Sequence, residues 1–84
     1  MELFSKIRDF NPVEEVFGDW QTLDSSNVAA YRYNKGERLM EVRFHSGRVY
    51  QFVDVPENVA EGIATADSPG KYFNASIKNS YSHR

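Results

Sequence analysis

The chain has 84 residues, of which 40% are hydrophobic and 14% aromatic, a size and composition that exclude a second domain and argue against intrinsic disorder. Because it contains no cysteine, disulfides and thiolate metal sites are excluded, which fits a reducing compartment. A net charge of −2 disfavours non-specific binding to long nucleic acid, which normally requires a strongly basic face.

The apolar residues are too scattered for a membrane span, since no apolar run approaches the roughly 20 residues that cross a bilayer. Residues 1–10 interleave acids with bases and lack the apolar core of a signal peptide. We therefore expect a cytoplasmic protein without membrane contact. Residues 1–24 and 51–67 are net negative, whereas residues 25–50 and 68–84 are net positive. If the fold brings the two positive blocks together, they can hold a ligand with a few phosphates.

The first 24 residues predict short helical pieces. Phe4 and Ile7 lie three apart, and Val13 and Phe17 lie four apart, as on one face of a helix. We therefore expect residues 1–24 to be a helical N-terminal extension. Residues 25–84 are expected to form a small α+β domain, and the chain is expected to be one structural domain overall.

Three strands are expected next, over residues 28–33, 39–45 and 48–53, because short turn-forming segments separate them. Strands joined by such short turns predict an antiparallel meander of three to four strands. In the second strand Glu41 and Arg43 alternate with apolar neighbours, so one face is apolar and the other charged. Aromatic residues of the third strand should line the buried face.

A helix is expected over residues 56–66, because Pro56 suits its first turn and Glu57 favours the positive end of its dipole. Its apolar stripe should lie on the sheet, with Gly62 allowing a close approach. After the break that follows, apolar residues four apart predict a short last helix over residues 71–78.

A series of residues in the second part of the chain follows a known pattern in order: Ser25-Ser26-Asn27-Val28, Tyr33, Val42, Phe44, Ser46-Gly47-Arg48-Val49-Tyr50, Phe52, Asp54-Val55-Pro56, Ala66, Ser68, Gly70-Lys71-Tyr72-Phe73-Asn74, Ile77 and Tyr81. Through these residues the chain resembles the KTSC domain, a small family named for its occurrence at the C-terminus of some lysyl-tRNA synthetases. Members of the family also stand alone, including in phages. The resemblance implies a fold more firmly than an activity.

The segment from Ser68 to Asn74 is the strongest candidate for chemistry. A small-residue turn that enters a short helix presents free backbone N–H groups, and Lys71 adds a positive charge where those donors point. Such an arrangement holds an anion. A plain helix break with a solvent-exposed lysine would account for the same residues.

A second candidate segment is Ser25-Ser26-Asn27, which either donates hydrogen bonds to a ligand or caps the local backbone. Arg48 can complete a phosphate clamp, and tyrosines can stack on a base. No catalytic or metal-binding set is predicted, because the two histidines stand at a strand end and near the terminus. The candidate ligand-binding residues are Ser25, Ser26, Asn27, Arg48, Tyr50, Ser68, Gly70, Lys71, Tyr72 and Asn74.

The sequence therefore favours a non-enzymatic module, without a cofactor, that binds a nucleotide or another small phosphorylated ligand. As a stand-alone protein it would sequester a nucleotide signal, for which phage anti-defence is a conjectured setting. Two alternatives stay open, an RNA- or tRNA-binding accessory domain and a protein-interaction module. Because so short a chain offers little concave surface, we also expect a homo-oligomer with a shared pocket.

Overall fold

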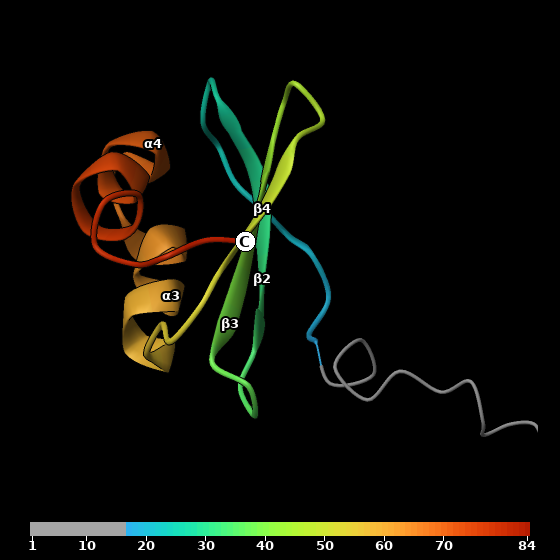
Figure 1. Ribbon diagram of the computed structural model, residues 1–84. Helices are drawn as coiled ribbons and strands as arrows, with labels where there is room; N and C mark the ends of the chain where they lie inside the picture. The colour runs from blue at the N-terminus through green and yellow to red at the C-terminus, as the bar shows by residue number, and fades with distance from the viewer. Residues whose placement is uncertain (1–16) are drawn as a thin grey trace, which may run out of the picture.

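The computed structural model describes residues 17 to 84. They form a four-stranded antiparallel sheet in the order β1-β2-β3-β4, with all helical segments on one face (Figure 1). The elements are β1 (Gln21–Thr22), β2 (Val28–Asn34), β3 (Leu39–Phe44), β4 (Val49–Phe52), α3 (Glu57–Thr65), α4 (Pro69–Tyr72) and the π-helix η1 (Phe73–Ile77). The predicted α+β fold, a meander covered by a helix and a short C-terminal helical segment, is confirmed.

The register of the sheet gives it one apolar and one charged face. Val42 of β3 lies between Tyr31 of β2 and Tyr50 of β4, and these side chains point toward the helices. On the opposite face, Arg32 pairs with Glu41, and the two side chains form a salt bridge of 2.6 Å. This alternation follows from the two-residue repeat of a strand and matches the pattern read from the sequence.

The prediction of helix is wrong for the part of the N-terminal extension that the structure describes, residues 17–24. Residues 17–24 are extended rather than helical: β1 pairs with β2, and Gly18 N–H donates to the Tyr33 carbonyl at 3.2 Å. Trp20 lies on the charged face, with the guanidinium carbons of Arg32 and Arg43 at 4.7 and 4.5 Å from its ring centroid. Strand pairing and these cation–π contacts outweigh a weak helical pattern. The rest of the predicted extension, residues 1–16, lies outside the described residues.

Helix α3 packs on the apolar face of the sheet through Ala60 and Ile63, which are buried. Gly62 lies directly against Tyr72 of α4: a Cβ atom added at this glycine would stand 2.6 Å from the Tyr72 Cζ. The Tyr72 hydroxyl in turn donates to the Val59 carbonyl at 2.6 Å. The close approach predicted at Gly62 is therefore present, and its partner is an aromatic ring.

The last helical segment begins at Pro69, two residues earlier than predicted, because Ser68 caps it by accepting a hydrogen bond from the Lys71 N–H. It then widens into the π-helix η1, in which Phe73 and Ile77 are buried. These are the two apolar residues whose spacing predicted the helix. Single π turns are rare in proteins, and those that occur are often found at functional sites.

The C-terminal segment, residues 82–84, runs along the free edge of β4. Val53 N–H donates to the Ser82 carbonyl, and Arg84 N–H donates to the Gln51 carbonyl, both at 2.9 Å. The Arg84 Nε also donates to the Gln51 Oε1 at 2.7 Å. This strand-like pairing was not predicted. It covers an edge that would otherwise be open to pairing with another chain.

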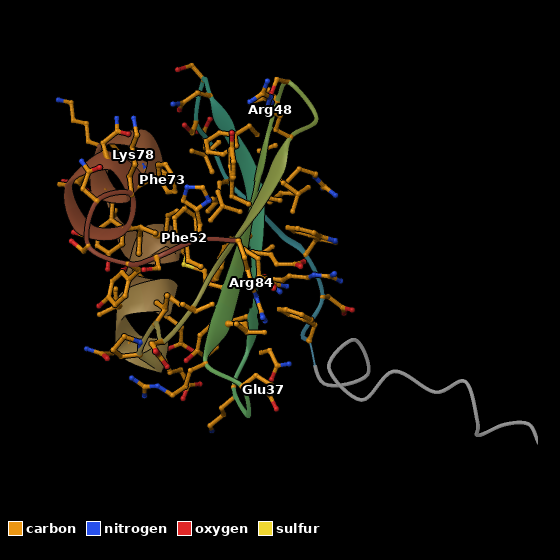
Figure 2. All side chains as sticks on the ribbon, in the orientation of Figure 1. Glu37, Arg48, Phe52, Phe73, Lys78 and Arg84 are labelled. Carbon is orange, nitrogen blue, oxygen red and sulfur yellow. The ribbon has the colours of Figure 1, made fainter. Side chains whose placement is uncertain are left out.

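Aromatic rings dominate the core between the sheet and η1, as expected from the composition. The Phe73 ring makes edge-to-face contacts with Phe44 and Phe52, with centroids 5.3 and 5.6 Å apart. Phe44 makes a further contact of the same kind with Tyr50. Figure 2 shows Phe52 and Phe73 facing one another between the sheet and the helical layer. This ring cluster supports the surface described below.

The protein is expected to lose stability in alkaline solution because of its partly and fully buried tyrosines. Burial is the main cause that raises the pKa of Tyr31, Tyr33 and Tyr72 above the usual value, and the Glu61 carboxylate raises the pKa of Tyr31 further. The stability that these neutral phenols contribute is complete below about pH 10, where the unfolded chain also keeps them neutral, and is lost as the pH rises through the folded pKa values. Thermal unfolding followed across this range should show the decline.

The Tyr72→Phe variant provides the control for this pH dependence. It removes one of the three phenols whose pKa is raised, so its stability should fall less steeply above about pH 10 than that of the wild type. At neutral pH it should instead be slightly less stable, because the hydrogen bond to Val59 is lost. Identical slopes in the two proteins would contradict the prediction.

Candidate functional site

Three adjoining hollows open where the end of the sheet meets α4 and η1, and all three are lined by Asn27. We call the first the aromatic hollow; its volume is about 400 Å³, within the range of small-molecule sites. Its lining residues are Asn27, Phe44, Tyr50, Phe52, Phe73, Asn74, Lys78, Asn79 and His83. Phe52 and Phe73 are buried and form its floor, while Phe44 and Tyr50 are partly exposed.

The second hollow, the arginine hollow, has a volume of about 370 Å³ and shares Phe44 and Tyr50 with the first. Its lining residues are Ser26, Asn27, Phe44, His45, Ser46, Arg48 and Tyr50. The Arg48 Nη1 donates to the Tyr50 hydroxyl at 3.0 Å, which holds the guanidinium beside the ring. Figure 2 shows Arg48 at the outer end of the sheet. A guanidinium has five donor hydrogens, so most remain for a ligand.

The third hollow, the serine hollow, of about 470 Å³, contains the predicted anion-binding turn. Its lining residues are Asp24, Ser25, Ser26, Asn27, Asp67, Ser68, Gly70, Lys71 and Asn74. The Lys71 N–H donates to the Ser68 Oγ at 3.3 Å, and the Tyr72 N–H donates to the Ser68 carbonyl at 2.9 Å. These two amides, expected to be free for a ligand, are therefore used by the protein itself.

The loop that carries Asn27 is fixed by local hydrogen bonds. The Ser25 Oγ donates to the Asn27 Oδ1 at 3.0 Å and accepts from the Val28 N–H at 3.3 Å. His45 holds the same loop: its N–H donates to the Asn27 carbonyl, and its Nε2 lies 2.9 Å from the Ser25 carbonyl oxygen. Ser25 thus caps the local backbone, the alternative role considered for it, and Asn27 is held at the junction of the hollows.

Gly70 brings α4 against this loop. A Cβ atom at Gly70 would stand 2.9 Å from the Asn27 Oδ1, closer than real side chains allow. The two segments singled out in the sequence, around Asn27 and around Lys71, therefore meet in space although they are far apart in the chain. Their meeting is the part of the predicted site that the structure brings together most directly.

Nine of the ten predicted site residues line at least one hollow: Ser25, Ser26, Asn27, Arg48, Tyr50, Ser68, Gly70, Lys71 and Asn74. Tyr72 lies apart from the three hollows, with its ring against Gly62 and its hydroxyl on Val59, so its place is in the packing of α4 against α3. Helical geometry would have predicted this separation of Tyr72 from the site, because residues two apart in a helix, such as Tyr72 and Asn74, point in different directions.

Six lining residues of the aromatic hollow were missed as site residues: Phe44, Phe52, Phe73, Lys78, Asn79 and His83. Phe44 was detectable, since strand alternation places it beside Tyr50 on the helix-facing side. His83 gave no local signal, because only the pairing of residues 82–84 with β4 brings it to the hollow.

The charges around the three hollows differ. Lys78 contributes to the aromatic hollow and Arg48 to the arginine hollow, and none of the lining residues within positions 17–84 is acidic in either. The lining of the serine hollow, by contrast, combines Lys71 with two aspartates, Asp24 and Asp67. An anionic ligand is therefore favoured in the first two hollows and disfavoured in the third.

Residues 17–84 contain neither a metal-binding cluster nor a membrane-spanning helix. No three histidine, aspartate or glutamate side chains gather closely enough there to hold a metal ion. No helix in the same range is long and apolar enough to cross a bilayer.

Comparison with known proteins gives consistent matches. The model of the KTSC domain matches residues 24–81. The crystal structure of a KTSC domain protein from Yersinia pestis has a TM-score of 0.75 and 29% sequence identity, over 79% of this chain and 93% of that one. An uncharacterized protein of Stutzerimonas stutzeri is 36% identical over 56 residues, which cover 67% of this chain and 79% of the relative.

Larger relatives are also similar to the chain. A lysine–tRNA ligase of Nostoc sp. is 33% identical over 60 residues, or 71% of this chain. Those residues make up 11% of the ligase, so the similarity concerns a small part of that enzyme.

Proposed function

The chain belongs to the KTSC domain family, and we propose that it is a non-enzymatic module that binds a nucleotide or another small phosphorylated ligand. The base would occupy the aromatic hollow, and the phosphate would lie toward Arg48 in the arginine hollow. A stand-alone module of this kind acts by sequestering its ligand.

The observation that supports this proposal best is the joining of a ring-lined hollow to a cationic one. Phe44 and Tyr50 line both hollows, so a flat ring resting on them lies next to the Arg48 guanidinium. Aromatic side chains stack on any base, and guanidinium groups bind phosphate oxygens in pairs. Asn27 and Asn74 add amide donors and acceptors at the edge, the groups that read the polar edge of a base.

The test is thermal unfolding in the presence of mono-, di- and cyclic nucleotides, because a ligand that binds only the native state raises its apparent stability. We expect a rise for at least one nucleotide, a much smaller rise for Arg48→Gln, and an unchanged rise for Lys35→Gln. Lys35 is a suitable control because it is exposed in the β2–β3 turn and its partner is Glu57, away from the hollows. No rise with any nucleotide would contradict the proposal.

A second candidate is an RNA-binding accessory domain, favoured by the similarity to part of a lysine–tRNA ligase. Its mark would be an affinity for RNA that falls steeply as salt is added, since several phosphates are neutralised together. The net charge of −2 disfavours RNA binding relative to binding of a ligand with few phosphates.

Native mass spectrometry would report a co-purifying small molecule and also test the predicted homo-oligomer.

A further inference from the structure

The C-terminal segment contributes a wall of the aromatic hollow. Residues 82–84 are held to β4 by two backbone hydrogen bonds and by the Arg84–Gln51 side-chain bond. His83 lies between these anchors and pairs with Phe52 as an isolated bridge. In Figure 1 the end of the chain lies beside β4, and Figure 2 labels Arg84 there, at the edge of the sheet.

The His83 ring faces the rings that a ligand would contact. Its centroid lies 5.2 Å from that of Tyr50 and 5.6 Å from that of Phe52, with interplanar angles of 73° and 63°. The residue is exposed as a whole, and it lines the aromatic hollow together with Lys78 of the segment after η1. These two T-shaped contacts hold the ring in place, and because the residue is exposed, part of the ring remains accessible to a ligand.

We infer that His83 is a ligand-stacking residue, which makes the aromatic hollow select ligands that carry a flat ring over those that offer only phosphate. The inference rests on the proposed function, because it assigns the ring-binding part of that same site. His83 lies beyond residues 24–81, the range that the family model matches. The feature therefore lies outside the matched range, and the pairing of residues 82–84 with β4 fixes its position.

Binding of adenosine monophosphate and of inorganic pyrophosphate, measured by titration calorimetry, tests the inference. Loss of one base stack corresponds to a loss of affinity of about tenfold. We expect His83→Ala to weaken binding of the nucleotide by about this factor and to leave binding of pyrophosphate unchanged. His83→Phe should restore nucleotide affinity. Lys35→Gln, the control variant away from the hollows, should bind the nucleotide as well as the wild type.

The placement of His83 can be measured without any ligand. Its ring current should shift the NMR signals of the Tyr50 ring protons, and His83→Ala should remove that shift. If the shift is absent, or if wild type and His83→Ala bind the nucleotide equally, the inference about His83 is wrong while the proposed function stands. If the shift is present but the wild type binds none of the mono-, di- and cyclic nucleotides used above, both the proposed function and the stacking role are wrong.

Discussion

Replacing Phe52 with alanine should lower the free energy of unfolding by about 3–5 kcal/mol, the usual cost of removing a buried phenylalanine ring. Phe52 is 2% exposed and is the largest fully buried side chain among residues 17–84. Its ring contacts Phe73 across the layer interface and His83 at the sheet edge, so its loss leaves a cavity and unpaired aromatic edges. For a domain of this size, that cost is a large part of the total stability.

Val49→Ala provides the matched control for this substitution, because Val49 belongs to the same strand but is 46% exposed. Its effect should be within about 0.5 kcal/mol, as for surface positions in general. Urea unfolding, monitored by circular dichroism, gives both values. Equal losses in the two variants would show that the Phe52 ring is not part of a packed core.

Replacing Gly62 with alanine should destabilise the protein by about 1–3 kcal/mol, the range for overpacked positions. At an open helical position the same change stabilises a protein by about 1 kcal/mol, so even the sign is informative. The added methyl group would overlap the Tyr72 ring, whose hydroxyl is bonded to Val59 on the same helix. Relief of the overlap requires α4 to move away from α3.

A double-mutant cycle with Tyr72→Ala separates the overlap from other effects of the substitution. In the Tyr72→Ala background the Gly62→Ala change should become stabilising, because the ring is gone and only the helix propensity of alanine remains. The coupling between the two sites would then be large. If Gly62→Ala costs the same in both backgrounds, the ring is not what excludes a side chain there.

Local sequence patterns were sufficient for the parts of the fold that local forces decide. The alternation through Glu41 and Arg43 predicts the orientation of β3, and Pro56 with Glu57 predicts the start of α3 within one residue. The residues that were mispredicted depend on partners far along the chain. Trp20 acquires its place from two arginines of β2 and β3, and no window of residues around it contains them.

In the candidate site, too, some features follow from the local sequence and others from contacts between segments far apart in the chain. Ser25, Asn27, Gly70 and Lys71 were identified from their residue types, and the structure brings them together. The local charge was predictable only in part: Asp67 stands four residues before Lys71 in the sequence, whereas Asp24 joins the lining of the same hollow only in the folded chain. The ring-lined surface next to the lysine turn is therefore a better candidate for an anionic ligand than the turn itself.

Trp20 has a practical consequence for experiments on this protein. It is the one tryptophan of the sequence, and its ring contacts the guanidinium groups of Arg32 and Arg43 on the face of the sheet opposite the three hollows. Its fluorescence should respond when β1 separates from the sheet and should be nearly insensitive to a molecule bound among the aromatic rings. Emission intensity thus offers an optical signal for unfolding that stays independent of occupancy.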